Sequence, residues 1–425
     1  MAFRFTLLIL AGSLGVLAQS NLATLTGIVT DPTGAAVANA QVSVTSAATG
    51  LTTRATTNAE GIYLLPNLPP AVYTLEIQAE GFKRKTVRDL RLDAAMRARQ
   101  DVQIELGDVQ QSVEVQAAVT PLQFETAEQS ETITSKDIIN MPLNGRAPYS
   151  LLMLSTGVSA AGDDPSSLDY SGGLSLNGSR RGSNAYVVDG ASTTHIGGIG
   201  ERIGSIEAIQ EFKVLANAYS AEYGRTSGGV ISFQMKSGTK EFHGSAYEFH
   251  RNGVLNANSW ENNARNIPRG ALIRNEFGAT AGGLVPKTRG RLFYFLSYEG
   301  IRDSIPIARL RTIPDPSLRG GNFSRVPVPI YDPTNDTPFP NNTIPSSRLD
   351  PAAQKLMALF PAPNQTGIFN SRFGISTDNW ARQSGQNDNK NFGTFRVDYS
   401  PTDLDKIFVT FSHVNEGPRD LIRDF

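Results

Sequence analysis

Residues 392–399 read Phe-Gly-Thr-Phe-Arg-Val-Asp-Tyr, and their alternation decides the fold class. Successive side chains of a β-strand point to opposite faces of the sheet. The apolar and polar positions fall on different faces: Phe395, Val397 and Tyr399 on one, Thr394, Arg396 and Asp398 on the other. The stretch therefore predicts a strand with one apolar and one polar face, which is the pattern of a strand that separates lipid from a polar lumen.

Two further segments show the same alternation. The apolar positions are Phe277, Ala279, Ala281 and Val285 in residues 274–285, and Ile407, Val409 and Phe411 in residues 406–414. Residues 291–302 are apolar on both faces, so their orientation stays open. Strands of a soluble sandwich can alternate in the same way, so the pattern alone does not separate the two architectures.

The lengths of the connections favour a membrane barrel. Residues 286–290 and 401–405 form short turns, whereas residues 252–273 and 303–391 form long connections. Short and long connections alternate in this way between the periplasmic and external ends of bacterial barrels. About five strands can be counted between residues 239 and 425.

The composition is compatible with a membrane protein that spans the bilayer with strands. No segment approaches the ~18 consecutive apolar residues of a membrane helix. The 425 residues include no cysteine, which excludes disulfides and thiolate metal sites. Lys and Arg number 39 and Asp and Glu 40, for a net charge of −1, which argues against bulk electrostatic binding to nucleic acid.

Residues 121–238 carry a series of short motifs. Ser135 is expected to cap a short helix that ends at Asn140. Asp189-Gly190 follows an apolar run and predicts a hairpin turn. The motif residues are Asn144, Gly145, Arg146, Asp189, Gly190, Glu211, Glu222, Tyr223, Gly224 and Arg225.

In these motifs and strands, the chain from residue 112 to its end resembles the Oar-like group of TonB-dependent outer-membrane receptors. The resemblance implies that residues 121–238 form an α/β plug domain and that residues 239–425 begin an antiparallel outer-membrane β-barrel. Receptors of this kind close 22 strands around the plug. We therefore expect the chain to be a fragment, a truncated gene product or one part of a split receptor.

Residues 108–120 read as an extended linker. The resemblance implies that Val113, Glu114, Val115, Gln116 and Ala117 form the TonB box, the segment gripped by the periplasmic domain of a TonB-type energy-coupling protein. An extended segment can add to the edge of a partner's sheet through main-chain hydrogen bonds. The alternative is that the segment is only an extended linker that binds no partner.

Residues 22–107 alternate short strand-like runs with turn signals, as a small β-sandwich does. This stretch resembles the carboxypeptidase regulatory-like domain, on the strength of Gly27-Ile28-Val29, Asp31 to Gly34, Gly61-Ile62-Tyr63, Leu68-Pro69-Pro70 and Gly81-Phe82. The resemblance implies a transthyretin-like, carbohydrate-binding-like fold. The segment holds no histidine for a peptidase zinc site, and its tyrosines are expected in the core.

Residues 1–18 have the features of a signal peptide: Arg4, then an apolar run, then small residues before the bond between Ala18 and Gln19. We therefore expect an exported protein. With the resemblance, this predicts residence in the outer membrane, in contact with its lipid, with the N-terminal domain in the periplasm.

The sequence thus predicts a mainly β transporter that binds an external solute, such as an oligosaccharide or a peptide, and imports it with energy from the inner membrane. No enzyme, cofactor or metal is expected. Gly-x-Ser-x-Gly does not occur, and His243 and His250 are an odd number of residues apart, on opposite faces of a predicted strand. The alternative is a secreted or surface carbohydrate-binding or adhesion module without transport.

Overall fold

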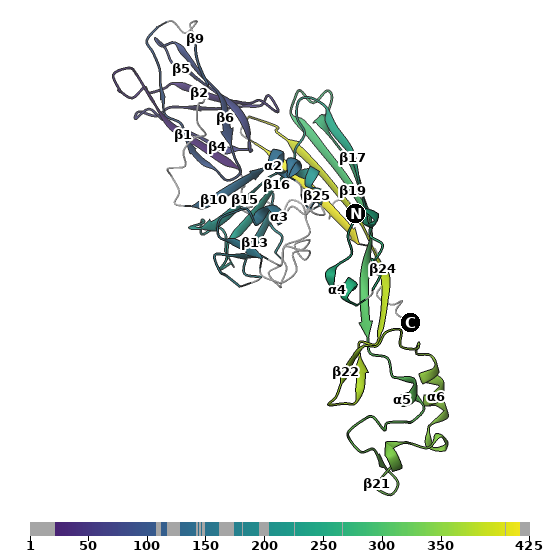
Figure 1. Cartoon of the computed structure of the whole chain (residues 1–425). Coiled ribbons are helices and arrows are strands. Elements are labelled where there is room, and N and C mark those ends of the chain that lie inside the picture. The colour runs from purple at the N-terminus through teal and green to yellow at the C-terminus, as the bar shows by residue number, and fades with distance from the viewer. Residues whose placement is uncertain are drawn as a thin grey trace, which may run out of the picture. The chain divides into compact units, whose positions relative to one another are not determined.

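The computed structural model describes residues 22–107, 112–116, 128–141, 143, 146, 149–160, 174–180, 182–194, 204–224, 226–265, 267–403 and 405–416. Strands make up most of the regular structure of these residues (Figure 1). The chain forms two compact units. One contains the described residues up to 246 with 278–299 and 392–414, and the other contains 247–277, 300–391 and the described residues from 415 onward.

The N-terminal part is a sandwich of two sheets. Its strands are β1 (Ala23–Thr30), β2 (Gln41–Ser46), β3 (Thr52–Thr56), β4 (Ile62–Leu68), β5 (Ala71–Gln78), β6 (Arg84–Leu92), β7 (Arg97–Arg99), β8 (Val102–Gln103) and β9 (Ser112–Gln116). One sheet has the order β4-β1-β7, with β8 also paired to β1, and the other has the order β3-β2-β5-β6-β9. The mainly β prediction for this region is confirmed.

The sandwich buries its tyrosines, as the sequence predicted. Tyr63 and Tyr73 are almost fully buried, and their hydroxyl groups donate hydrogen bonds to the carbonyl oxygens of Gln100 at 2.6 Å and Pro69 at 2.7 Å. Burial without a partner would leave each hydroxyl unsatisfied, so these bonds let an amphipathic ring serve as a core residue. Gly27 lies where a Cβ atom would collide with the Gln100 carbonyl oxygen. Only glycine lets β1 pass so close to that backbone.

A separate sheet forms in the middle of the sequence. Its strands are β10 (Gln129–Thr134), β13 (Ala185–Val188), β14 (Ala191–Ser192), β15 (Ile209–Asn217) and β16 (Val230–Met235), in the order β10-β15-β16-β13-β14. This middle sheet is accompanied by α2 (Ser135–Asn140), α3 (Tyr149–Leu152), η4 (Ile206–Ala208) and the hairpin of β11 (Val158–Ala160) and β12 (Leu174–Leu176). Tyr149, Phe212 and Phe233 are buried in its core.

Two local predictions for the middle sheet had different outcomes. The hairpin at Asp189-Gly190 is confirmed: it joins β13 to β14 with φ of 49° and 87°, the positive values of a type I′ turn. The cap of α2 was assigned to the wrong residue. Thr134 is the N-cap, because its side chain accepts from the backbone N–H of Asp137 while the Asp137 carboxylate accepts from the N–H of Thr134. Ser135 is the first residue of the helix.

The C-terminal sheet has five described strands. They are β17 (His243–Asn252), β18 (Ile273–Leu284), β19 (Leu292–Arg311), β24 (Trp380–Tyr399) and β25 (Ile407–Glu416), in the order β17-β18-β19-β24-β25. These strands form an open sheet (Figure 1). η5 (Gly253–Leu255) and α4 (Trp260–Ala264) lie between β17 and β18.

The long connection is shorter than the sequence suggested. Residues 303–391 were expected to form it, but β19 continues to Arg311 and β24 already begins at Trp380. Polar residues dominate residues 381–391 of β24, so this outer half lacks the apolar alternation of the inner half, and Pro306 interrupts the pattern in the outer half of β19. The remaining connection contains α5 (Pro316–Arg319), β20 (Tyr331–Asp332), β21 (Thr337–Pro338), η6 (Pro340–Asn342), η7 (Ser346–Arg348), α6 (Pro351–Ala358), β22 (Ile368–Asn370) and β23 (Ile375–Thr377).

The two faces of the C-terminal sheet differ in polarity. In β24, Thr394 and Arg396 are buried while Phe395 and Tyr399 are exposed, which confirms the predicted alternation. The structure also decides the orientation of residues 291–302, which the sequence left open. The buried positions are Phe293, Phe295, Ser297 and Glu299, and the exposed ones are Leu296 and Tyr298. The described helices include none with the length and apolar character needed to cross a membrane.

Candidate functional site

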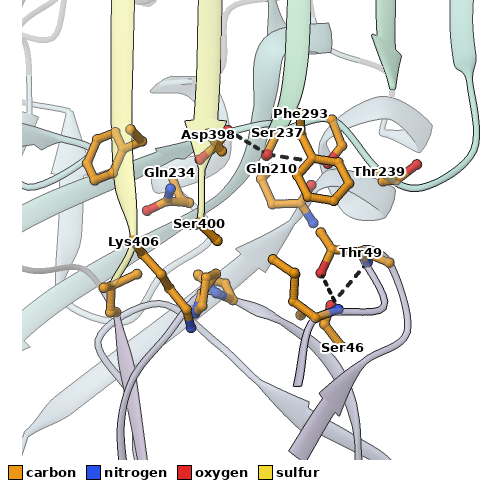
Figure 2. Close-up of a pocket in the computed structure, with 18 of the residues that line it drawn as sticks. Ser46, Thr49, Gln210, Gln234, Ser237, Thr239, Phe293, Asp398, Ser400 and Lys406 are labelled. Carbon is orange, nitrogen blue, oxygen red and sulfur yellow. Dashed lines mark hydrogen bonds between the residues drawn. The ribbon is translucent and has the colours of Figure 1, made fainter. Parts of the chain in front are cut away.

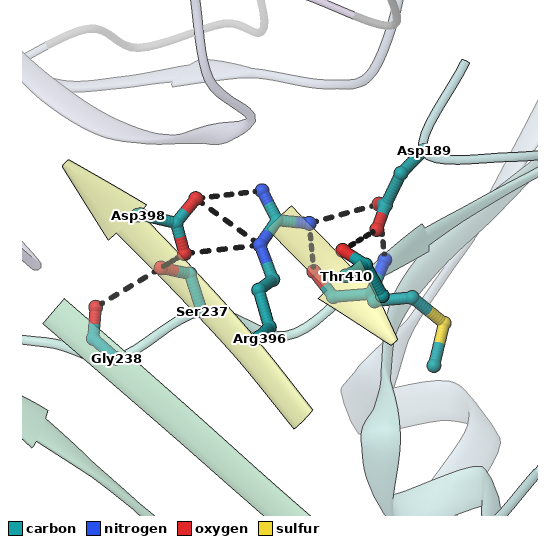
Figure 3. A network of polar contacts seen from close by, with 7 residues as sticks. Asp189, Ser237, Gly238, Arg396, Asp398 and Thr410 are labelled. Atoms are coloured by element: carbon teal, nitrogen blue, oxygen red, sulfur yellow. Dashed lines mark hydrogen bonds and ion pairs between the residues drawn. The ribbon is translucent and has the colours of Figure 1, made fainter. Parts of the chain in front are cut away.

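Arg396 of β24 is the centre of a buried polar network (Figure 3). Its guanidinium donates to Asp189 Oδ1 at 2.9 Å and to the Asp398 carboxylate at 2.8–3.1 Å. It also donates to the Met235 carbonyl oxygen at 3.2 Å. The side chains of Arg396 and Asp189 are 6% and 4% exposed. Because the guanidinium fork can bond two carboxylates at once, it bridges its own strand and the middle sheet.

Further donors complete the network around both carboxylates. Asp189 accepts from the backbone N–H of Met235 at 3.0 Å and from the Thr410 hydroxyl of β25 at 2.7 Å. Ser237 donates to Asp398 at 2.6 Å (Figure 3). Buried charges are tolerated only when paired and hydrogen-bonded in this way. The network therefore fastens the β13–β14 turn of the middle sheet to β24 and β25.

A second polar contact joins the same two sheets. Ser205, the N-cap of η4, donates its hydroxyl to the Glu299 carboxylate of β19 at 3.0 Å. Gly204 lies next to Thr394 and Phe392 of β24, and a Cβ atom there would stand 3.5 Å from the Thr394 hydroxyl oxygen. The middle sheet is thus held against the polar face of the C-terminal sheet at more than one point.

A pocket of about 570 Å³ lies between the sandwich, the middle sheet and the C-terminal sheet within the first unit (Figure 2). Ser46 and Thr49 come from the sandwich, Gln210 and Gln234 from the middle sheet, and Lys406 precedes β25. The Lys406 ammonium donates to the Asn67 carbonyl oxygen at 2.9 Å, and burial lowers the pKa of Lys406 to about 8. The Lys406 ammonium therefore links the start of β25 to the sandwich.

Glu211 of β15 joins the middle sheet to the sandwich. Its carboxylate accepts from the backbone N–H of Ala94, which follows β6, and lies 3.8 Å from the Arg91 guanidinium. Arg91 in turn donates to Asp93 at 2.7 Å. Burial, aided by the negative charge of Asp93, raises the pKa of Glu211 to about 7.

The remaining motif residues do not gather in one place. Arg146 donates to Glu207 at 3.0 Å, beside η4. Tyr223 is buried with Val187, Leu215 and Val230, and burial raises the pKa of its hydroxyl. Glu222 and Gly224 are exposed. Six predicted site residues lie outside the described part of the chain: Ala18, Gln19, Ala117, Asn144, Gly145 and Arg225.

The first four residues of the predicted TonB box form most of β9. β9 runs parallel to β6, with Arg84 opposite Ser112, Lys85 opposite Val113 and Val87 opposite Val115. This docked strand was not predicted, because the alternation of the segment indicates a strand but names no partner strand. The sequence pattern places Arg396 only at a polar position of a strand. Its polar-face position was a visible signal, but nothing in the sequence linked it to Asp189.

Comparison with known proteins agrees with this architecture. Residues 24–105 match the family described as carboxypeptidase regulatory-like domain, and residues 234–419 match the family described as outer membrane beta barrel domain. The chain therefore combines a carboxypeptidase regulatory-like domain with outer-membrane barrel strands, and it is a protein of the outer membrane. It is homologous to the TonB-dependent transporter Oar of Myxococcus xanthus, with 31% identity over 260 residues.

The compared proteins are longer than this chain. The alignment with the Myxococcus transporter covers 57% of this chain and 23% of that protein. The siderophore receptor PirA from Acinetobacter baumannii is similar at 16% identity, over 68% of this chain and 31% of the receptor, with a TM-score of 0.37. The outer membrane transporter YddB from Escherichia coli is similar at 12% identity, over 68% of this chain and 33% of that chain, with a TM-score of 0.41. All three are described as transporters or receptors.

Proposed function

We propose that the protein acts in TonB-dependent import across the outer membrane. It binds an external solute, and a TonB-type protein supplies energy from the inner membrane. The homology to a TonB-dependent transporter supports this role. The structural observation that carries it is the buried pair between Arg396 of the barrel strands and Asp189 of the middle sheet. A transporter of this kind needs a domain that is seated firmly on the barrel wall and can be shifted by force.

In this proposal the middle sheet is the plug, and residues 121–238 are its extent. The Asp189 turn is its anchor on β24 and β25. Breaking one buried ion pair costs more than rearranging exposed contacts, because each charge would be left without a partner. The plug therefore moves only when the energy-coupling protein pulls on the chain before β10.

The coupling segment in this proposal is residues 113–117. It precedes β10 by 12 residues, so tension on the segment reaches the middle sheet through a short tether. Main-chain pairing of an extended segment with the periplasmic domain of the TonB-type protein provides the grip. The solute is expected at the external connection between β19 and β24, and an oligosaccharide or a peptide is the expected class of solute.

The structure gives less support to a carbohydrate-binding module without transport. Sugar platforms use exposed aromatic rings, and Tyr63 and Tyr73 of the sandwich are buried in its core. Phe82, the third aromatic residue of the sandwich, packs against the same core. The polar inner face of the C-terminal sheet has a clear purpose in a plugged barrel, whereas an adhesive module has no need of it.

The experiment replaces residues 112–117 with a Gly/Ser segment of equal length, in the natural full-length gene product. The variant should reach the outer-membrane fraction at the level of the natural protein. It should lose capture of the purified periplasmic domain of the TonB-type protein from the same bacterium. Undiminished capture would show that the coupling segment lies elsewhere, and absence of both proteins from the outer-membrane fraction would contradict the proposed location.

A further inference from the structure

The sandwich already occupies the segment that the energy-coupling protein is proposed to grip. β9 pairs with β6 over five consecutive residues, from Arg84 opposite Ser112 to Arg88 opposite Gln116. It is the last strand of the order β3-β2-β5-β6-β9 (Figure 1). The segment is therefore not a free tether, because its main-chain groups on one edge are bonded to the sandwich.

The docked segment also turns one face toward the sandwich. The register places Val113 opposite Lys85, on the face of the sheet that carries Val87. Val87 belongs to the core of the sandwich, and Val113 is half-buried. Alternate side chains supply the specificity when a strand adds to a partner's sheet. The Val113 side chain is therefore partly covered by the sandwich before any partner approaches the outer edge of β9.

We propose that β9 on β6 is an autoinhibited resting state, in which the carboxypeptidase regulatory-like domain withholds the coupling segment until β9 detaches. This inference rests on the coupling role proposed above for residues 113–117. The partner then binds only the fraction of molecules in which β9 is free. Its apparent affinity is reduced by that fraction, so the β6–β9 pairing sets how readily the transporter engages its energy source.

A disulfide lock tests the proposal directly. Residues 1–425 contain no cysteine, so an introduced pair forms the only possible bridge among them. Arg84→Cys and Ser112→Cys lie opposite each other in the register and outside the proposed box. Adjacent strands are ~4.8 Å apart, within the Cα range of a disulfide. The matched control is Gln41→Cys with Thr56→Cys, an exposed pair that joins β2 to β3 at the far side of the same sheet.

Binding of the purified periplasmic domain of the TonB-type protein is measured for each full-length variant, oxidised and then reduced. The oxidised lock should bind at least tenfold more weakly than its reduced form, while the oxidised control should bind like the natural protein. Equal binding by the oxidised lock would overturn the proposal, since the partner would then add to the outer edge of β9. Failure of the Arg84/Ser112 variant to form its disulfide would also overturn it.

The natural protein separates this inference from the function on which it rests. If neither the natural protein nor the reduced variants bind the domain, the coupling role itself is wrong. The proposed autoinhibition then fails as well, because it rests on that role. If all of them bind the domain and the oxidised lock binds it equally well, the coupling role stands and the autoinhibition is wrong. Amide exchange of residues 113–116 without the partner adds a second readout, in which slow exchange supports docking and free exchange contradicts it.

Discussion

At the scale of single residues, the ionisation of Glu211 opposes folding. Its pKa rises from an ordinary 4.5 to about 7 because the carboxyl group is buried beside Asp93. Below pH 4.5 both the folded and the unfolded states are protonated. Between pH 4.5 and 7 the unfolded state ionises first, so stability falls as the pH rises through this window. The loss approaches ~3 kcal/mol at most.

Glu211→Gln removes this titration while keeping a carbonyl oxygen that can accept from the Ala94 N–H. We expect the variant to gain stability relative to the natural protein as the pH rises from 4.5 to 7. The measurement is the free energy of urea unfolding of both proteins at pH 4.5, 6 and 7.5. Parallel profiles across this range would show that Glu211 does not titrate with a raised pKa.

The Arg396–Asp189 pair makes the second prediction at this scale. Arg396→Met leaves the buried Asp189 carboxylate without its guanidinium and should cost about 3–5 kcal/mol of unfolding free energy. Adding Asp189→Asn should recover part of that loss, because the uncompensated charge disappears. Arg54→Ala is the control: it breaks an exposed pair with Asp403 and should cost less than ~1 kcal/mol. Additive effects in the double variant would mean that the two residues are not coupled.

The sequence identified only part of this residue-level picture. Asp189-Gly190 could be recognised, because a type I′ turn needs two positive φ values and has a strong local signature. The partner of Asp189 could not, because Arg396 lies 207 residues further along the chain and pairs through the tertiary structure. The raised pKa of Glu211 was equally invisible, since it depends on the burial of β15 beneath the loop after β6.

At the scale of elements, β1 depends on the absence of a side chain at Gly27. Gly27→Ala would drive a methyl group into the Gln100 carbonyl, which also accepts from the Tyr63 hydroxyl. We expect a loss of about 3 kcal/mol, because backbone cannot move aside as a side-chain end can. Gly50→Ala is the control: its φ is 74° but nothing lies within 4 Å, so strain alone should cost about 1 kcal/mol.

Thermal or urea unfolding of the two glycine variants tests this ranking. A loss at Gly27 no larger than that at Gly50 would mean that β1 can shift away from the Gln100 backbone without cost.

The elements that could be predicted are those with a local sequence signal. The apolar alternation of β24 and the turns of the sandwich are recognised from neighbouring residues alone. The outer half of β24, which begins at Trp380, was missed because a run of polar residues has no such signal.

At the scale of the whole molecule, the order of parts followed from composition and motifs, whereas the contacts between parts did not. The sequence predicted a sandwich, a linker, a central domain and barrel strands. It did not predict that the linker strand returns to β6, because a parallel pairing has no short turn to announce it. Replacement of residues 112–117 tests the coupling role, whether or not the strand is docked, whereas the β6–β9 lock depends on that return.

The parallel direction of β9 has a mechanical consequence. Both strands run the same way, from the Arg84–Ser112 pair to the Arg88–Gln116 pair. A pull along the strand axis would load all of these hydrogen bonds together, in shear. A pull sideways from either end would load them one after another and peel the strand away at much lower force. The force needed to detach β9 from β6 therefore depends on the direction of the pull. The angle of the tension decides whether β9 stays paired with β6 or detaches.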